Sequence, residues 1–434
     1  MGDGQAPRRV WPVVLVVFGI AASLRLAVVA WAPGVPESDG RAYHQYALMW
    51  LESGAYQNVD GSPGIRWMPG WPTLLASLYR VFGELPRAGM LANALFDAGT
   101  AAVTALLGIR LFRRRVGVAA GLIYALWPGM LAYSATLFSE PLFGLLFSSA
   151  LLALATPADR TPRAGRAVAA GLAFGLCAYV KSEPLALLPA LLFAIWRSTP
   201  EPSAFARRAL AFVGVTGALL LPWTIRNYHV FDRFIPTSAS GGVVVHLANH
   251  EGARGRQDFA RNRQLSRLYR GETMALTTIQ RNDAGWGEAW RFAREHPGEQ
   301  LRLVGRKLRV TYGGDTAALR AIRGRNPEPH IDLVSFGQLS RWANTYWFVA
   351  LLCAALGAAG WRRWPRGVAP LLFGPLATWW GLHAIFLGGE RFHVPEIPIY
   401  AILAGVGLSE LAERAQRRLP ARILPPFARP RSAT

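Results

Sequence analysis

Long apolar runs separated by short clusters of arginine are the feature that most limits how this chain can fold. The first run, residues 11–32, follows Arg8 and Arg9 and is long enough to cross a lipid bilayer. Hydrophobic residues make up 52% of the 434 residues and charged residues only 17%. This composition excludes a disordered chain and is too apolar for a large soluble globule. We therefore expect an all-α protein that crosses the membrane many times.

The net charge of the chain has to be interpreted together with the positions of the charged residues in the sequence. Lysine and arginine number 47 against 26 acidic residues, a formal net charge of +21, which by itself suggests nucleic acid. The basic residues, however, lie in the gaps between apolar runs, as in polytopic membrane proteins. We therefore expect the membrane, and not nucleic acid, as a partner. Cys177 and Cys353 both lie inside apolar runs, so neither a disulfide framework nor a cysteine metal site is predicted.

The hydropathy pattern predicts ten spans, and we interpret the first as a retained helix because many spans follow it. The fifth and sixth are short and are separated only by Lys181, Ser182 and Glu183, so they could form one broken helix. Arginines precede and follow this pair, which places both flanking loops in the cytoplasm and requires an even number of crossings between them. The predicted spans are 11–32, 89–109, 116–138, 141–158, 167–180, 184–196, 209–225, 342–361, 367–389 and 394–409.

The same arginine asymmetry predicts the organisation of the chain in a cytoplasmic (inner) membrane, with both termini in the cytoplasm. We expect an N-terminal transmembrane module at 1–225, which contains a first outer loop at 33–88. A large extracytoplasmic loop at 226–341 follows, then C-terminal spans at 342–410 and a basic cytoplasmic tail at 411–434. Residues 70–83 are apolar but too short to cross, which predicts a surface helix. A further helical pattern extends from about Gly285 to Tyr312 and is broken at His296-Pro297.

Ionisable side chains gather at the outer ends of the predicted spans. A charged residue at a span edge is costly, so each is a functional candidate. A carboxylate can take a proton from an attacking hydroxyl, whereas Arg, Lys and His can neutralise a phosphate leaving group. The extracytoplasmic set is Glu37, Asp39, Arg41, Tyr43, His44, Glu140, Lys181, Glu183, Glu390, Arg391 and His393.

Structural roles compete with each of these interpretations. Asp39 follows a proline-containing turn and could cap the helix that begins near Arg41. Glu140 precedes a proline at a helix start, where a negative charge complements the helix dipole. Lys181 could extend from a short helix to the membrane surface, and Arg391 could be an ordinary interfacial residue.

Two further groups have structural explanations. Arg25 and Asp97 lie deep within predicted spans, where pairing between the two spans is favoured over catalysis. The remaining histidines are scattered without metal-ligand spacing, so they predict no metal site.

The ordered series of these segments resembles the GT-C superfamily of integral-membrane glycosyltransferases. The similarity is greatest to glycosyltransferase family 39, with protein O-mannosyltransferases, the lipid A aminoarabinose transferase and related lipopolysaccharide sugar transferases. Two departures stand out: ANHEGARG occupies the place of an Asn-Asn-Pro segment, which removes support for His250 as a site residue, and we expect no sizeable soluble domain after the last span. The segments are ESDGRAYHQYALMWLESGAY, RWMPGWPTLLASLYRVFG, NALFDAGTAAVTALLGIRLFRRRVG, SEPLF, VKSEP, PWTIRNYHVF, GVVVHLANHEGARG, EHPGEQLRLVGRKL and ERFHVPEIPIYAIL.

The resemblance implies an inverting transfer of sugar from a polyprenyl-phosphate donor to an envelope lipid, glycan or protein on the extracytoplasmic face. It matches Asp39 to the catalytic base and Glu140 to the acidic position that orients a substrate. Lys181, Arg391 and Arg226 would neutralise the donor phosphate. A divalent cation at Asp39 and Glu140 stays open, and no other cofactor is expected. The substrate-binding candidates are completed by Glu183, His393, Tyr43 and Arg66.

Two other classes of function are consistent with many spans. A transporter or flippase also carries embedded charges, but it usually places them near the bilayer midplane at a repeat interface. Here the charges gather at one face and no internal repeat is visible. An envelope-assembly scaffold would explain the topology but not the clustered charges. The sequence therefore favours the transferase.

Overall fold

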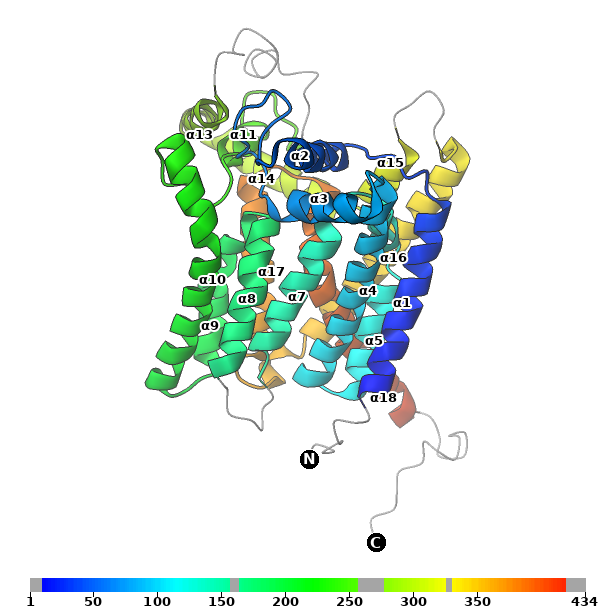
Figure 1. Cartoon of the computed structure of the whole chain (residues 1–434). Coiled ribbons are helices and arrows are strands. Elements are labelled where there is room, and N and C mark those ends of the chain that lie inside the picture. Colours follow the sequence, from blue (N-terminus) through cyan, green and yellow to red (C-terminus); the bar gives the residue numbers. More distant parts are fainter. Residues whose placement is uncertain (1–9, 157–163, 257–276, 325–329, 419–434) are drawn as a thin grey trace.

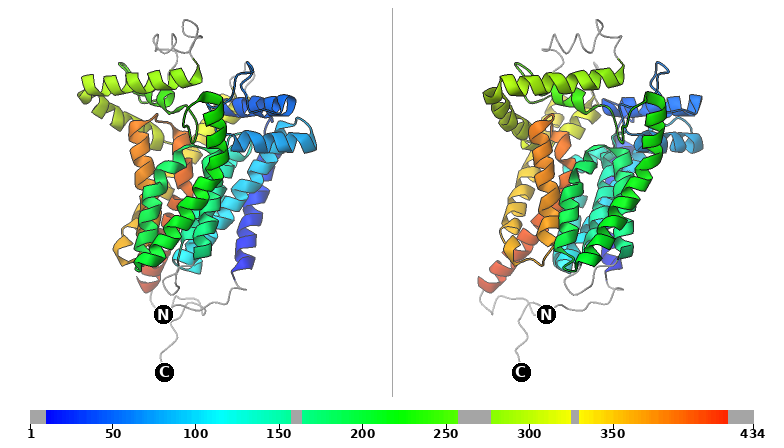
Figure 2. Two further views of the ribbon diagram at one scale, coloured as in Figure 1. Left: turned by 60° about the vertical axis from the view of Figure 1, so that its left-hand side comes forward. Right: turned by 90° about the vertical axis from the view of Figure 1, so that its left-hand side faces the viewer.

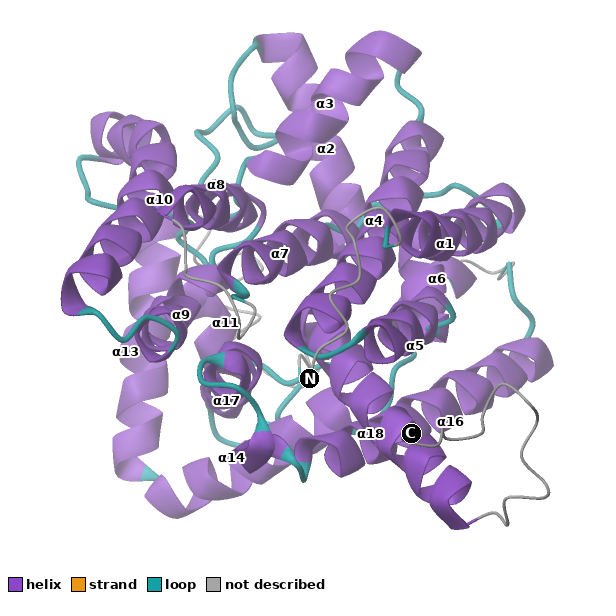
Figure 3. Ribbon diagram, turned by 90° about the horizontal axis from the view of Figure 1, so that it is seen from below, coloured by secondary structure: helices purple, strands orange, loops and turns teal. Residues whose placement is uncertain are grey.

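The computed structural model describes residues 10–156, 164–256, 277–324 and 330–418. Within these residues the chain forms helices and no strand, with one isolated bridge between Gln57 and Pro63. Figure 3, which views the bundle from below, shows helices packed beside one another and joined by loops, with no strand among the described residues. The all-α prediction is confirmed.

Long apolar helices run side by side and form the body of the molecule (Figures 1 and 2). Among the residues that the structure describes, five helical segments are individually long and apolar enough to cross a membrane. They are α1 (Trp11–Trp31), α4 (Pro86–Leu111), α10 (Pro202–Phe231), α17 (Val368–Ile385) and Glu390–Arg417, which includes all but the last residue of α18 (Ile397–Arg418). The other bundle helices are α7 (Glu140–Leu154), α8 (Ala164–Val180), α9 (Leu188–Arg197) and α16 (Leu333–Ala358).

One predicted span is broken. The sequence predicts a continuous helix over 116–138, but α5 (Arg114–Ala125) and α6 (Pro128–Ser134) meet at a bend of 57°. Trp127 is extended, with φ −67° and ψ 114°, because the ring of Pro128 disfavours helical geometry in the residue before it. Counting this pair as one span gives six candidates by length and composition. The count of ten crossings stays a prediction.

Shorter helices lie across one end of the bundle. They are α2 (Asp39–Ser53), α3 (Gly70–Phe82), α11 (Gly241–His246), α13 (Thr278–Glu295), α14 (Pro297–Tyr312) and α15 (Ala317–Arg323). Figure 1 shows them at the top, whereas α1 begins and α18 ends at the bottom. The helix expected over 70–83 corresponds to α3, and the break expected at His296-Pro297 separates α13 from α14. We call the end with α2, α3 and α13 the outer end, following the topology that the sequence predicts.

The deep ionisable residues pair between spans, as expected. Arg25 of α1 donates from Nε to Asp97 Oδ2 of α4 at 2.5 Å, and both side chains are fully buried. Arg25 Nη1 also donates to Ala125 O at 2.9 Å, and Tyr124 OH donates to Asp97 Oδ1 at 2.6 Å. Each buried charge thus has a charged and a neutral partner, which is the condition for placing it inside a membrane.

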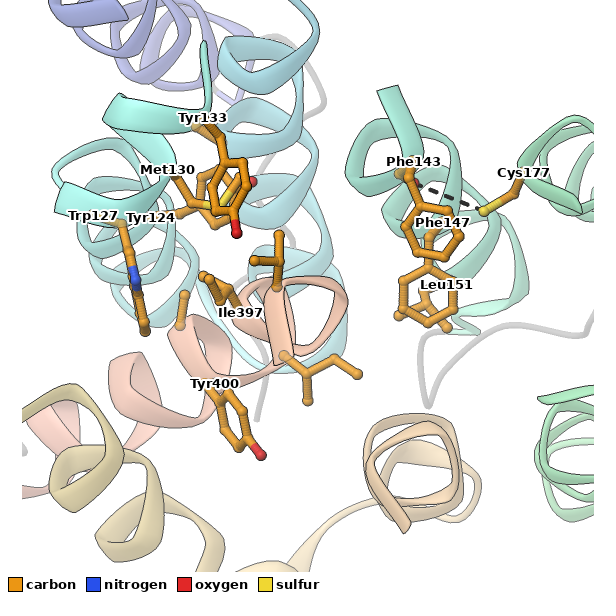
Figure 4. Close-up of a cluster of buried hydrophobic side chains, with 14 of the residues drawn as sticks. Tyr124, Trp127, Met130, Tyr133, Phe143, Phe147, Leu151, Cys177, Ile397 and Tyr400 are labelled. Atoms are coloured by element: carbon orange, nitrogen blue, oxygen red, sulfur yellow. Dashed lines mark hydrogen bonds between the residues drawn. The ribbon is translucent and has the colours of Figure 1, made fainter. Parts of the chain in front are cut away.

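Small residues set the spacing of the helices and aromatic residues fill the space between them. A side chain added at Gly117 of α5 would place its Cβ 2.4 Å from Ala105 O of α4. The two helix backbones can approach this closely because glycine has no side chain. In Figure 4, Tyr124 and Tyr133 form one aromatic group, while Phe143 and Phe147 form a second beside Cys177. The Cys177 thiol lies 3.8 Å from Phe143 O and ties α8 to α7 just below the outer end.

Candidate active site

Asp39 is the first residue of α2, and its carboxylate is available for contacts outside that helix. The preceding residue, Ser38, has φ 52°, a conformation that residues other than glycine rarely adopt and that costs about 1–3 kcal/mol. Neither Ser38 nor Asp39 makes a side-chain capping bond. Asp39 Oδ2 instead accepts a hydrogen bond from Arg391 Nη1. The interpretation of Asp39 as a helix cap is therefore wrong.

Glu140 is the first residue of α7, and its side chain is fully buried. The position at the helix N-terminus suits a negative charge, as the sequence indicated. Two cations also reach it: Lys181 Nζ lies 2.9 Å from Oε1, and Arg391 Nη2 lies 3.3 Å from Oε2. A buried carboxylate with two cationic donors is held in the charged form and in a fixed orientation.

Arg391 joins the two carboxylates. It lies in the 3₁₀ segment η4 (Glu390–Glu396), where it donates from Nε to Glu140 and from Nη1 to Asp39. Its guanidinium lies 4.3 Å from the centre of the Phe138 ring, a cation–π contact that fixes its plane. Lys181 follows directly after α8, and its Nζ lies 5.7 Å from the centre of the Phe143 ring.

These four residues form an ion cluster of two carboxylates and two cations at the outer end of the bundle. The residues come from α2, α7, the end of α8 and η4, so the structure brings together the segments that the sequence selected. Their exposure separates their roles: the Asp39 side chain is 34% exposed, whereas that of Glu140 is 0% exposed. Asp39 can therefore meet a substrate, and Glu140 positions the two cations.

Tyr43 lies one turn beyond Asp39 on α2 and contacts the same region. Its hydroxyl is 3.4 Å from Ser139 Oγ, next to Glu140. Burial raises the pKa of the Tyr43 phenol well above its ordinary value, so this group stays protonated at neutral pH. Tyr43 thus supplies a neutral hydroxyl beside the ion cluster.

The other predicted substrate-binding residues, among the contacts that the structure describes, form no hydrogen bond or ion pair with the four cluster residues. Arg226 of α10 donates to Gly64 O at 2.8 Å and to Tyr56 O at 3.0 Å, and so ties the first outer loop to the bundle. Arg66 is exposed beside Trp67 in that loop.

Glu183 and His393 likewise form no bond with the cluster, although Glu183 lines the same cavity as Lys181. Glu183 is exposed at the start of η2 (Glu183–Leu187). His393 is buried, with Nδ1 2.7 Å from Thr311 O and its ring stacked 4.1 Å from the Trp347 ring. The contacts of His393 therefore fix η4 against α14 and α16.

Two cavities lie at the outer part of the bundle, and Lys181 of the ion cluster lines the second. A cavity of about 840 Å³ lies between α3, α7, α8 and α10, and its apolar wall includes Leu142, Leu146 and Leu176, with Arg226 at its edge. A second cavity, of about 360 Å³, has Lys181 in its wall and lies against α13, α17 and η4. Phe143 of α7 faces the second cavity, whereas Leu142 faces the first, so the outer part of α7 separates the two.

The cluster does not fit a divalent cation in this arrangement. Asp39 and Glu140 are the candidate ligands, but the positively charged guanidinium of Arg391 lies between them. Among the residues that the structure describes, no group of three or more His, Cys, Asp or Glu side chains could hold a metal ion.

Two residues near the second cavity were missed by the sequence interpretation. His383 of α17 lines this cavity, and its Nε2 lies 3.2 Å from Oε1 of the fully buried Glu396. Both lie within apolar segments, and the cost of an ionisable residue there was a signal that could have identified them.

The chain matches one family model over part of its length. The model is that of dolichyl-phosphate-mannose-protein mannosyltransferase, and it matches residues 65–225, which include Glu140 and Lys181. A comparison with curated protein sequences finds no match.

The fold is similar to solved membrane enzymes. The oligosaccharyltransferase of Archaeoglobus fulgidus in its apo form aligns with a TM-score of 0.56 and 14% identity, over 95% of this chain and 52% of that chain. The same enzyme, AglB, in complex with an inhibitory peptide and a dolichol-phosphate aligns with a TM-score of 0.53 and 14% identity, over 96% of this chain and 53% of that chain. ArnT of Cupriavidus metallidurans bound to undecaprenyl phosphate aligns with a TM-score of 0.49 and 15% identity, over 94% of this chain and 81% of that chain.

The chain spans about half the length of the oligosaccharyltransferase, and 14% identity establishes a shared fold without establishing a shared activity. The expected GT-C-like architecture is confirmed. The chain is therefore similar in fold to the GT-C integral-membrane glycosyltransferases, and its residues 65–225 match the model of the dolichyl-phosphate-mannose-protein mannosyltransferase family.

Proposed function

We propose that the protein transfers a hexose or pentose from a polyprenyl-phosphate donor to a lipid, glycan or protein acceptor, with inversion, on the extracytoplasmic face of the cytoplasmic membrane. The observation that carries this proposal is the ion cluster itself. A partly exposed carboxylate, Asp39, is fixed beside two cations at the end of an apolar bundle. A base and a phosphate-binding pair are the groups that this transfer needs.

The shape of the molecule supports a lipid-linked donor. The cavity of about 840 Å³ has an apolar wall on the flank of α7 and α8, where Leu176 is 45% exposed. Such a wall suits an isoprenoid chain that arrives from the bilayer. The matching family is named for dolichyl-phosphate-mannose, and AglB has been solved with a dolichol-phosphate.

The proposed reaction is a single displacement at the anomeric carbon of the donor sugar. An acceptor hydroxyl, or another nucleophile that bears a proton, attacks this carbon from the face opposite the phosphate. The bond between the anomeric carbon and the phosphate oxygen breaks, and its electron pair leaves with the polyprenyl phosphate. Asp39 accepts the proton of the acceptor, and attack from the opposite face inverts the configuration.

Lys181 and Arg391 have to bind the phosphate while they remain oriented by Glu140. The buried Glu140 carboxylate holds both cations at the outer end before the donor arrives. Lys181 has further donors on the same ammonium group, and Arg391 has five N–H donors. A phosphate can therefore take additional hydrogen bonds from both side chains without displacing Glu140.

Mass spectrometry of envelope glycans, glycolipids and glycoproteins from a deletion strain tests the proposal. We expect one sugar to be missing from one class of acceptor, with its polyprenyl-phosphate donor accumulating. The purified protein should then transfer the radiolabelled sugar from that donor. An intact sugar profile, with a lipid retained in the cytoplasmic leaflet, would contradict transfer and indicate a flippase.

A further inference from the structure

The cavity of about 360 Å³ has a mixed lining, most of which the transfer mechanism leaves without a role. Its size is within the range of small-molecule pockets. Aromatic rings of Trp286, Trp379 and Phe392 contribute flat apolar faces, while Ser238 and Asn282 contribute hydrogen-bonding groups. Flat apolar faces and hydroxyl-binding groups together suit a sugar ring, which has apolar C–H faces and polar edges.

The orientation of His383 in this cavity is fixed by a buried carboxylate. Its partner Glu396 has 0% exposure and accepts hydrogen bonds on both carboxylate oxygens. Oε1 receives Tyr312 OH at 2.7 Å as well as His383 Nε2, and Oε2 receives Tyr400 OH at 2.6 Å and Trp380 Nε1 at 3.2 Å. Four donors around one buried carboxylate fix its position and orientation.

This network determines which nitrogen of His383 can act on a ligand. Glu396 Oε1 is a carboxylate oxygen that accepts hydrogen bonds, so the contact at 3.2 Å favours the tautomer of His383 in which Nε2 carries the hydrogen and donates it to Glu396. In the neutral imidazole, Nδ1 is then the acceptor. His383 therefore presents a hydrogen-bond acceptor whose position is fixed by a buried carboxylate.

We infer that this cavity binds the sugar ring of the donor and that His383 Nδ1 accepts a hydrogen bond from one of its hydroxyls. The inference rests on the proposed function. In a polyprenyl-phosphate sugar, the ring is bonded directly to the phosphate. Lys181, the proposed phosphate ligand, bonds Glu140 and also lines this cavity. A donor phosphate at Lys181 therefore places its sugar in the cavity beside His383.

Comparison of the binding of undecaprenyl phosphate with that of the same lipid carrying a sugar isolates this interaction. The probes are undecaprenyl phosphate and a panel of undecaprenyl-phosphate mannose, glucose, galactose and aminoarabinose, measured with the purified full-length protein. We expect at least one sugar-bearing lipid to bind wild type at least about tenfold more tightly than undecaprenyl phosphate, as one or two hydrogen bonds and a stacked ring provide. This increment is the sugar contribution.

Two substitutions of the same residue test the role of each nitrogen. His383→Gln keeps a polar atom near Nε2, whereas His383→Asn keeps one near Nδ1. We expect His383→Gln to lose the sugar contribution and His383→Asn to keep part of it, while undecaprenyl phosphate binds both variants within about twofold of wild type. His229→Gln, at an exposed position of α10, is the matched control and should behave as wild type.

A variant outside the buried network covers the case in which His383 is needed for folding. Trp286 is 43% exposed, and Trp286→Ala removes one wall of the cavity without touching Glu396. It should also reduce the sugar contribution. An unchanged sugar contribution in His383→Gln, or equal losses for both lipids, overturns the inference.

The remaining outcomes separate this inference from the function on which it rests. Wild type that binds undecaprenyl phosphate without any sugar contribution overturns the inference alone. Wild type that binds no polyprenyl phosphate overturns the proposed function and the inference together. If the cavity variants change the KM for the acceptor while donor affinity is constant, the sugar in the cavity belongs to the acceptor, and the assignment to the donor is wrong.

Discussion

Lys181 Nζ lies 2.9 Å from Glu140 Oε1, where the end of α8 meets the beginning of α7. Arg391 reaches the same carboxylate and continues to Asp39. The contact between Lys181 and Glu140 therefore belongs to a chain of charges that begins in a buried helix terminus and ends at a partly exposed carboxylate. Each prediction about the cluster follows from this gradient of burial.

Asp39→Asn should reduce transfer by about 10²–10⁴-fold, the usual contribution of a general base, with normal expression and donor binding. Asparagine keeps an oxygen that can accept from Arg391, but it cannot take a proton from the acceptor. Turnover with a radiolabelled donor measures the effect. Glu37→Gln, two residues earlier, is the matched control and should retain activity. More than about a tenth of wild-type turnover in Asp39→Asn would exclude Asp39 as the base and make Glu140 the next candidate.

Lys181→Gln and Arg391→Gln should each weaken binding of a polyprenyl-phosphate sugar by about ten- to a hundredfold. A charge-assisted contact of this kind contributes about 1.5–3 kcal/mol. Affinity for the radiolabelled donor is the measurement. Arg233→Gln serves as control because Arg233 pairs with Asp283 at an exposed site. Unchanged donor affinity in both cluster variants would show that they serve only to orient the carboxylates.

Glu140→Gln should lower the free energy of unfolding by about 3–5 kcal/mol, because it leaves two cations beside a buried site without their shared carboxylate. Thermal unfolding in detergent measures this loss. Removal of Lys181 in the same chain should recover part of it, so the double variant should be less destabilised than the sum of the single variants. Glu413→Gln breaks an exposed pair with Arg113 and should cost less than about 1 kcal/mol. Strict additivity would argue against coupling within the cluster.

Lys307 should make stability depend on pH in the alkaline range. This residue of α14 is buried and donates to Asn249 Oδ1 and Ile385 O, and burial lowers the pKa of its ammonium group from 10.5 to about 8. Between pH 8 and 10.5 the unfolded chain binds more protons than the folded one at this residue, so its contribution to stability rises with pH in that window. Relative to Lys307→Met, the unfolding temperature of wild type should increase across it. Parallel curves for the two proteins would contradict the lowered pKa.

The assignment of the ion cluster to the extracytoplasmic side depends on the predicted membrane topology of the chain. After replacement of Cys177 and Cys353, a cysteine at Ser203 should resist a membrane-impermeant thiol reagent applied to intact cells. A cysteine at Val59, which is 66% exposed in the first outer loop, should react. The arginine asymmetry of the short loops is the reason for this expectation. Labelling at Ser203 from outside would reverse the topology and move the ion cluster to the cytoplasmic face.

Local patterns of the sequence predict much of this architecture. Apolar runs predict bundle helices because a backbone inside a bilayer must satisfy its own hydrogen bonds. The proline at His296-Pro297 predicts the boundary between α13 and α14, since proline cannot continue the preceding helix. Charges at span edges selected Asp39, Glu140, Lys181 and Arg391 because each is costly at such a position.

Tertiary structure decided how those residues are used. The sequence alone left Asp39 as either a cap or a free carboxylate, and only the approach of η4 to α2 directs it to Arg391. Exposure of Asp39 and burial of Glu140 likewise depend on packing between segments far apart in the chain. The pairing of His383 with Glu396 also depends on tertiary structure, because it requires α17 and η4 to pack against each other across the turn that joins them. A sequence pattern specifies which side chains a helix presents, whereas distances between helices are set by the packing of all of them.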